Sequence, residues 1–141
     1  MEFTLKQAKE YAKGNNIDKW VDKLLRATNN ENFANFTKDK GYWLGPIKIS
    51  LSKLKRCCGP EKEMKFNEPS DTWNKRTNKM IKDIEKGWDI PPIIVWFLNK
   101  ELSVADGSHR LEALRKSGFK KFWTIIWFDN LEDYKKNNSN L

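Results

Sequence analysis

The sequence has few of the residues that build covalent cross-links or metal sites. Only two cysteines, the adjacent Cys57 and Cys58, and one histidine, His109, occur among its 141 residues. Neighbouring cysteines cannot close a long stabilising loop with each other, so a secreted disulfide framework is not expected. A structural zinc site is not expected either, because zinc needs a larger set of Cys and His ligands. The positive charge of Arg56, next to the cysteines, favours the thiolate form and could make a thiol reactive. Alternatively, the two cysteines are simply buried as small side chains.

Long apolar stretches are missing as well. No run approaches the roughly 20 apolar residues that a membrane helix needs. The first residues lack the basic start and the apolar segment of a signal peptide. Because charged residues make up 33% of the chain, we expect a soluble, cytoplasmic protein without a membrane partner.

Positive charge and aromatic rings are abundant. The chain carries 27 basic and 19 acidic side chains, which give a formal net charge of +8. Such a surplus favours anionic partners, among them nucleotides and nucleic acid. Alternatively, the lysines form an ordinary solvated surface, since they are spread along the chain and many lie beside acids. The 7 Trp and 8 Phe residues are enough to pack the core of one domain at this length.

Residues 1–44 are predicted to form a helical N-terminal extension. Thr4 followed by Gln7 fits a capping box that starts a first helix, and Gly14 ends that helix. Apolar residues then recur at the spacing of one helical face: Ile17, Trp20, Val21, Leu24 and Leu25. We expect this stripe to pack on the main domain, with a partner protein as the alternative. Residues 29–40 are polar and are predicted to be a connection.

Residues 45–130 are predicted to form a small α+β domain, in which helices pack on a mixed sheet. A helix capped by Asp71 or Thr72 and a second helix that ends at Gly118 are expected, as is a tight turn at Asn99-Lys100. Residues 131–141 are predicted to be a polar tail, frayed from residue 135 onward. The expected strands cover residues 47–51, 93–97, 102–105 and 123–128.

The segment Asp106-Gly107-Ser108-His109-Arg110 lies where a strand is predicted to meet a helix. A helix start has backbone N–H groups without partners and a partial positive charge, which together bind anions. Gly107 lets the backbone approach a phosphate, Ser108 donates its hydroxyl or caps the helix, and Arg110 offers planar charged donors. His109 donates to a phosphate or moves a proton near neutral pH, and Asp106 can hold a magnesium ion that bridges phosphates. The alternative is an ordinary Asp-Gly turn with a serine cap and an ion-paired arginine.

This segment, continued by residues 111–118, resembles the signature of the ParB/sulfiredoxin-like superfamily. The resemblance covers residues 46–128, in which residues 91–95 and 102–105 are similar to the family's paired strands and residues 47–51 to its opening strand. It implies a fold that holds the phosphates of ATP, ADP or CTP on the equivalent turn and helix start. The family's activities include peroxiredoxin repair, free-serine phosphorylation, nucleotide hydrolysis that gates a DNA clamp, and nuclease action. The fold alone does not choose among them.

Departures from the family's patterns narrow the implied activity. Sulfiredoxins have their catalytic cysteine just before the histidine of the motif, where this chain has Ser108, so peroxiredoxin repair is not expected. Partitioning-type ParB proteins continue into a helix-turn-helix and a dimerisation region, whereas this sequence ends at Leu141, so a DNA clamp is not expected. Free-serine kinases use a glutamate from the loop after the first strand as a base. Glu61 lies in the corresponding loop, with Glu63 as its rival.

We therefore expect a nucleotide-dependent phosphotransferase or hydrolase that uses ATP, ADP or CTP with Mg²⁺. His109, Glu61 and Asp106 are the predicted catalytic residues, and the phosphates are expected on Gly107, Ser108, His109 and Arg110. Two alternatives remain open. The charge of +8 favours a nucleic-acid-binding module or nuclease. A non-catalytic nucleotide sensor would use its N-terminal helices to bind a partner protein.

Overall fold

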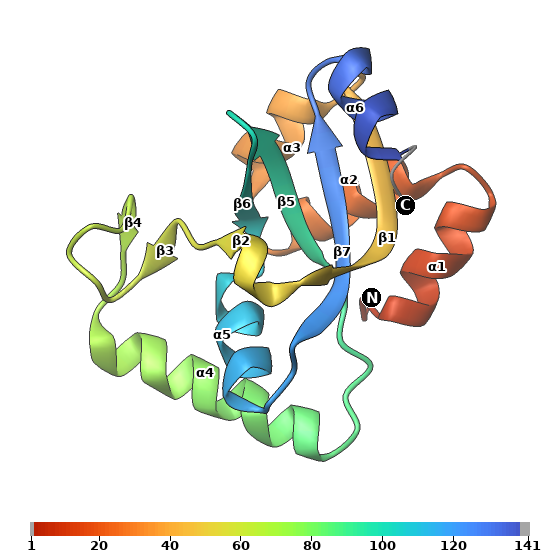
Figure 1. Cartoon of the computed structure of the whole chain (residues 1–141). Helices are drawn as coiled ribbons and strands as arrows, with labels where there is room; N and C mark the ends of the chain where they lie inside the picture. The colour runs from red at the N-terminus through yellow and green to blue at the C-terminus, as the bar shows by residue number, and fades with distance from the viewer. Residues whose placement is uncertain (1, 139–141) are drawn as a thin grey trace.

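The computed structural model describes residues 2–138 as a mixed sheet of five strands between two layers of helices (Figure 1). The central strands β5 and β7 are parallel, β1 and β6 run antiparallel to their neighbours β7 and β5, and β2 is parallel to β6. This arrangement confirms the α+β fold that the sequence predicts. The order across the sheet is β1 (Tyr42–Ser50), β7 (Lys121–Phe128), β5 (Ile93–Leu98), β6 (Glu101–Asp106) and β2 (Leu54–Lys55).

The central strand β5 is apolar in a continuous run because helices cover both of its faces. Ile93 and Val95 belong to one core, which includes residues of α5 (Ser108–Lys116) and packs against α4 (Ser70–Glu85). Ile94 points the opposite way, into a second core with the N-terminal helices. All three side chains are completely buried, and burial of each contributes roughly 1.5–3 kcal/mol to stability.

The N-terminal helices α1 (Leu5–Lys13), α2 (Ile17–Ala27) and α3 (Glu31–Thr37) form the layer over this second core (Figure 1). The apolar stripe of α2 packs there against Ile94 and Ile125 of the sheet. This contact confirms that the extension packs on the main domain. Thr4 caps α1 as predicted, because its hydroxyl accepts a hydrogen bond from the Gln7 amide at 3.1 Å. Four residues of the stripe are at most 2% exposed: Trp20, Val21, Leu24 and Leu25.

Two of the predicted boundaries in the first half of the chain are wrong. Residues 29–40 contain the helix α3, whose polar seven-residue sequence is too short to show an apolar period. Strand β1 begins at Tyr42 instead of residue 47, because its register with β7 shifts between Leu44 and Ile47 and interrupts the alternation. This strand therefore crosses the boundary that we predicted between residues 44 and 45.

Other segments follow the prediction more closely. The tight turn at Asn99-Lys100 is confirmed, since φ angles of 52° and 64° are the pair of positive values that a two-residue hairpin turn needs. Helix α4 begins at Ser70, slightly before the predicted caps. Most of the predicted tail forms the helix α6 (Leu131–Asn138). This helix packs against the sheet through Tyr134, whose ring stacks on that of Tyr42. Residues 139–141 lie outside the described residues.

The connection between β2 and α4 forms a small projection beside the sheet (Figure 1). Within it, β3 (Cys58–Gly59) pairs in parallel with β4 (Phe66–Asn67). Among the described residues 2–138, no helix combines the length and apolar character needed to cross a membrane.

Candidate functional site

The motif turn connects β6 to α5 and has a backbone geometry that requires glycine. Gly107 precedes the first helical residue with a φ of +112°, in the left-handed region. A Cβ atom added there would lie 2.8 Å from the guanidinium of Arg110. No side chain of residues 2–138 caps the first turn of α5. Its backbone N–H groups therefore have no side-chain acceptor, which is the condition for anion binding at a helix start.

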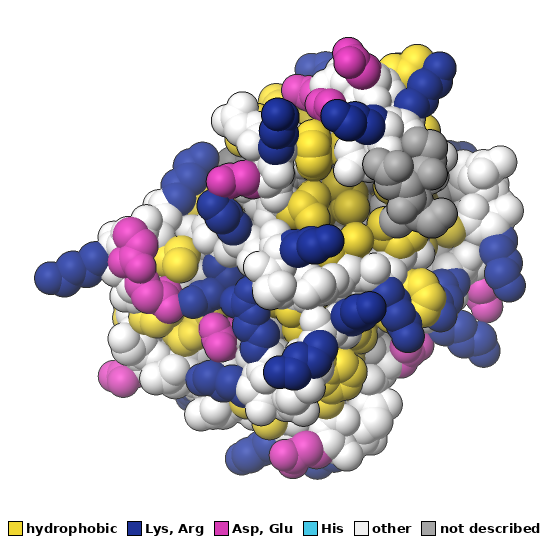
Figure 2. Space-filling view, in the orientation of Figure 1, with side chains coloured by type: hydrophobic (Ala, Val, Ile, Leu, Met, Phe, Trp, Pro, Cys, Tyr) yellow, Lys and Arg dark blue, Asp and Glu magenta, His cyan; other side chains and the backbone are white. Residues whose placement is uncertain are grey.

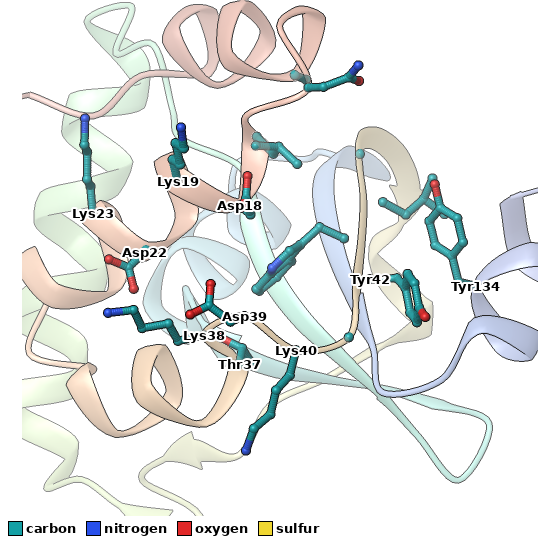
Figure 3. Close-up of a pocket in the computed structure, with 17 residues that line it drawn as sticks. Asp18, Lys19, Asp22, Lys23, Thr37, Lys38, Asp39, Lys40, Tyr42 and Tyr134 are labelled. Carbon is teal, nitrogen blue, oxygen red and sulfur yellow. The ribbon is translucent and has the colours of Figure 1, made fainter.

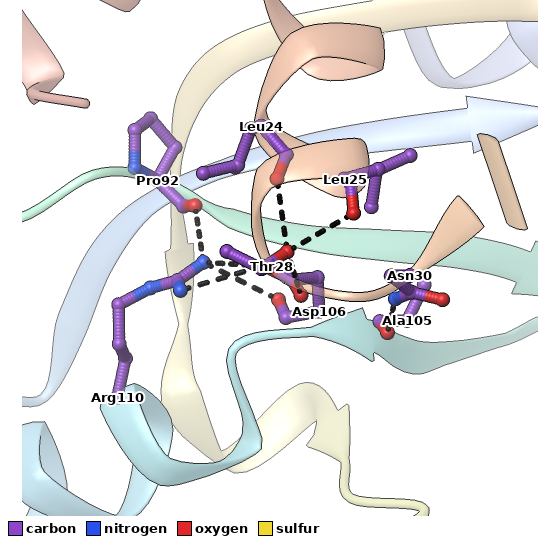
Figure 4. A network of polar contacts seen from close by, with 8 residues as sticks. All are labelled: Leu24, Leu25, Thr28, Asn30, Pro92, Ala105, Asp106 and Arg110. Atoms are coloured by element: carbon purple, nitrogen blue, oxygen red, sulfur yellow. Dashed lines mark hydrogen bonds and ion pairs between the residues drawn. The ribbon is translucent and has the colours of Figure 1, made fainter. Parts of the chain in front are cut away.

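Arg110 and Asp106 form a buried network on the inner side of this turn (Figure 4). The Arg110 guanidinium donates to the carbonyl oxygen of Pro92 at 2.9 Å and lies 3.4 Å from Oδ2 of Asp106. The two side chains are only 8% and 11% exposed. Arg110 therefore holds the turn from within the protein, and its guanidinium is not presented at the surface where we predicted a phosphate contact.

The N-terminal extension contacts the same turn at two points (Figure 4). The hydroxyl of Thr28, at the end of α2, lies 3.1 Å from Oδ1 of Asp106 and 2.9 Å from the carbonyl oxygen of Leu24, and it shares its one proton between these acceptors. The side-chain amide of Asn30 donates to the carbonyl oxygen of Ala105 at 2.8 Å. The extension therefore helps to fix the motif in place, a role that the sequence analysis did not identify.

Asp106 has little free capacity for the magnesium ion that we predicted there. One of its oxygens accepts the Thr28 hydrogen bond, and the other faces the permanent positive charge of Arg110, which repels a cation. In the part of the chain that the structure describes, no group of three or more His, Cys, Asp or Glu side chains is arranged to hold a metal ion. The residues around Asp106 therefore do not fit a metal site.

His109 is paired with Glu68, a carboxylate that the sequence analysis did not select. Nε2 of His109 lies 2.7 Å from Oε2 of Glu68, and the side chains are 13% and 12% exposed. The ring of Trp73 packs against the imidazole with centroids 4.5 Å apart. Arg76 lies 3.6 Å from the second oxygen of Glu68. A carboxylate that fixes the orientation of an imidazole is a common preparation for proton transfer.

The electrostatic surroundings keep this imidazole neutral. Burial is the main cause that lowers the pKa of His109 below its ordinary value of 6.5, and the positive charge of Arg76 lowers it further. Glu68 acts in the opposite direction without outweighing these effects on the pKa. At pH 7 Nε2–H therefore donates to Glu68 and Nδ1 is the proton acceptor, a tautomer assigned from the hydrogen bond.

Glu61, the base predicted from the sequence, lies in an ion pair away from the histidine. Its Oε1 is 2.5 Å from Nη2 of Arg56, and this hydrogen bond lowers the pKa of Glu61. Arg56 also lies 3.6 Å from Glu112 and over the ring of Trp73. A carboxylate that an arginine keeps ionised is a weak proton acceptor. The structure thus brings Glu68, and not Glu61, to the motif.

The thiol of Cys58 is also a neighbour of Glu68. Its Sγ lies 3.6 Å from Oε2 of the carboxylate. Burial and the negative charge of Glu68 raise the pKa of Cys58 above its usual value, and the nearby arginines do not compensate. The environment therefore favours the thiol form over the reactive thiolate considered from the sequence.

The start of α5 opens into an elongated groove of about 560 Å³. Ser108, the first residue of the helix, lines it together with both cysteines and Lys65 of the β3–β4 projection. The groove continues along β6 to aromatic side chains of α3 and β5, which are Phe33, Phe36 and Trp96. An uncapped helix start, a lysine and aromatic faces thus share one open space.

A second hollow, of about 800 Å³, lies between α2, the α3–β1 connection and α6 (Figure 3). Its wall mixes both charges, and no residue of the predicted site lines it. Because acidic and basic side chains are mixed in its wall, the hollow does not favour an anion. The charged side chains that line it are Asp18, Lys19, Asp22, Lys23, Lys38, Asp39 and Lys40.

Figure 2 shows Lys and Arg side chains over several elements of one face, gathered toward its middle, with acidic side chains mainly around them. The net charge of +8 is a general attraction for anions.

No protein-family model matches this chain, and no curated protein matches its sequence. Some solved structures are similar to part of it. A Pnob8-like ParB N-domain is 21% identical with a TM-score of 0.43, over 68% of this chain and 33% of that one. Sulfiredoxin from Arabidopsis thaliana is 18% identical with a TM-score of 0.41, over 67% of this chain and 97% of that one. ParB from Caulobacter crescentus, complexed with CTP-γ-S, is 22% identical with a TM-score of 0.38, over 64% and 47% of the two chains.

These structural neighbours are ParB N-domains and a sulfiredoxin. The match spans about a third of the Pnob8-like chain. The fold and the chemistry of this chain therefore have to be argued from its own residues.

Proposed function

We propose that the chain binds a nucleoside phosphate at the start of α5 and transfers or hydrolyses its terminal phosphoryl group. The observation that carries the proposal is the Glu68–His109 pair, 2.7 Å apart, beside a helix start that no side chain of residues 2–138 caps. Phosphoryl transfer needs a fixed place for negative charge and a group that handles a proton. In this proposal the first turn of α5 supplies both.

Each residue of the turn has a distinct part in this proposal. The phosphates bind to the backbone N–H groups of Gly107, Ser108 and His109 and to the Ser108 hydroxyl, with Lys65 of the same groove adding positive charge. Arg110 is a positioning residue that supports the turn from inside. A magnesium ion that came with the nucleotide would neutralise part of its charge, and no residue of this chain is proposed to hold it.

His109 accepts the proton of the attacking hydroxyl or water as the new P–O bond forms. The bond to the leaving phosphate breaks in the same displacement, and the leaving oxygen takes the electron pair. Glu68 stabilises the imidazolium that results and keeps the ring in place. The proposal gives the role of base to His109 in place of Glu61, because Glu61 is bound to Arg56.

The test is an assay of binding and phosphate release with ATP, CTP and GTP in the presence of Mg²⁺. We expect binding and turnover by the natural sequence. Glu68→Gln should lower turnover about 10²–10⁴-fold, the usual contribution of general acid–base catalysis. Nucleotide affinity should change little, because Glu68 contacts the imidazole and not the amides of the helix start.

Glu101→Gln is the matched control, since Glu101 is a carboxylate with 51% exposure that pairs with Lys55 at the surface. Its turnover should equal that of the natural sequence. Binding without phosphate release by the natural sequence would favour a nucleotide sensor and contradict the catalytic part of the proposal. Absence of binding to all three nucleotides would overturn the proposal as a whole.

A further inference from the structure

We infer that the N-terminal extension forms the wall against which the base of the nucleotide stacks, at the aromatic end of the groove. This inference rests on the proposed function and adds a base subsite to it. The extension would then be part of the ligand site as well as a packing layer.

The register of the sheet gives the distance between the two ends of the groove. Trp96 of β5 lies opposite Ser103 of β6, and the strand continues from there to the motif turn and Ser108. An extended chain rises about 3.3 Å per residue, so the aromatic end lies roughly 15 Å from the helix start. This span suits a nucleoside di- or triphosphate whose phosphates bind at Ser108.

The aromatic end presents a ring that is partly exposed although it also packs on Trp127 of the sheet. Phe36 of α3 is 45% exposed, and its ring lies 5.1 Å from that of Trp96. Phe66, which is 59% exposed, also lines the groove, but it lies on the β3–β4 projection next to Lys65 and not at the aromatic end. Exposed aromatic rings that line a groove shared with an anion-binding helix start are typical platforms for stacking of a base.

Two asparagines supply polar groups to the groove. Asn29 and Asn32 line the groove, and an amide side chain can both donate to and accept from the edge of a base. Asn30 has a different task, because its amide is bound to the carbonyl oxygen of Ala105.

The extension is also fastened to the phosphate end of the site. Thr28 and Asn30 bind Asp106 and Ala105 directly before the motif turn. Because these bonds lie between α2 and α3, they fix the distance between the aromatic wall and the helix start. A preorganised site of this kind binds its ligand without the cost of ordering a loop.

The test is calorimetric titration with ATP, CTP and inorganic tripolyphosphate, which has the phosphates but no base. We expect the natural sequence to bind ATP or CTP more tightly than tripolyphosphate. Phe36→Ala should weaken the nucleotide about tenfold, within the range for loss of one stacking partner, and leave tripolyphosphate unchanged. Phe36→Tyr should restore the nucleotide affinity, because the ring is retained.

Phe119→Ala is the control, since Phe119 is similarly exposed, at 39%, and packs on Phe122 outside the groove. It should bind all ligands like the natural sequence. Equal affinity of the natural sequence for nucleotide and tripolyphosphate, or no effect of Phe36→Ala, would overturn the base subsite and leave the phosphate site standing. Absence of binding to every ligand would overturn the phosphate site and the inference together.

Discussion

Replacement of Arg110 by methionine tests whether this arginine supports the turn or contacts a ligand. Methionine keeps most of the side-chain volume and removes the charge. The substitution deletes the bond to the Pro92 carbonyl and leaves the carboxylate of Asp106, with 11% exposure, without its cation. Breaking a buried ion pair costs about 3–5 kcal/mol. We expect the lower end of this range, since Thr28 still donates to Asp106.

The chain contains a matched control for this substitution. Arg26 and Asp22 form an ion pair with the same four-residue spacing at 3.0 Å, but their side chains are 36% and 37% exposed. Exposed pairs contribute about 0–1 kcal/mol, so Arg26→Met should have a small effect. Stability is measured by urea unfolding, in which the midpoint should shift at constant slope.

If Arg110→Met lowers the free energy of unfolding no more than Arg26→Met does, the buried network is refuted. The guanidinium would then be free to bind phosphate, as the sequence alone suggested. The double variant Asp106→Asn/Arg110→Met should recover part of the loss, because it removes the uncompensated buried charge as well.

Three further predictions concern the imidazole, the extension and the turn. The pKa of His109, the chain's one histidine, should lie below its ordinary value of 6.5 when it is measured by NMR. Glu68→Gln should lower this pKa further, since Glu68 raises it. An upward shift of the pKa in this variant would contradict the pairing. Because the folded-state pKa lies below the unfolded value, the stability that neutral His109 contributes should be lost as the pH falls below 6.5, and His109→Asn should flatten that dependence. Leu25→Ala, at a completely buried position, should cost about 2–5 kcal/mol in urea unfolding, whereas a loss below about 1 kcal/mol would mean that the extension is not packed. Gly107→Ala should destabilise more than Gly118→Ala, since both have positive φ but only Gly107 has a close neighbour; equal losses would speak against the observed turn.

The sequence predicts the layers of this fold well because its apolar periods are strong. The stripe on α2 and the run of residues 93–97 each identify a buried face without reference to any partner. Helix α3 escapes this reasoning, because its seven residues are too few to show an apolar period, although Phe33 packs on Trp96 and Trp127 of the sheet. The start of β1 escapes it because the register shift after Leu44 hides the alternation.

The candidate site was only partly predictable for a similar reason. The strand–helix turn identifies Gly107, Ser108 and His109 by local sequence, since each acts through its own position at the helix start. Glu68 lies 41 positions from His109, and no local pattern separates it from Glu61. The choice between these two carboxylates is made by Arg56, which binds Glu61 and leaves Glu68 to the imidazole.

The central claim is that a nucleoside phosphate binds at the start of α5, and the imidazole of His109 is a direct reporter of that place. Because the chain has one histidine, its ring resonances can be followed without ambiguity while ATP, CTP or tripolyphosphate is added. We predict a saturable shift of these resonances, with the same affinity that calorimetry gives. Nucleotide binding by calorimetry that leaves the His109 resonances unmoved would place the ligand elsewhere and contradict the account.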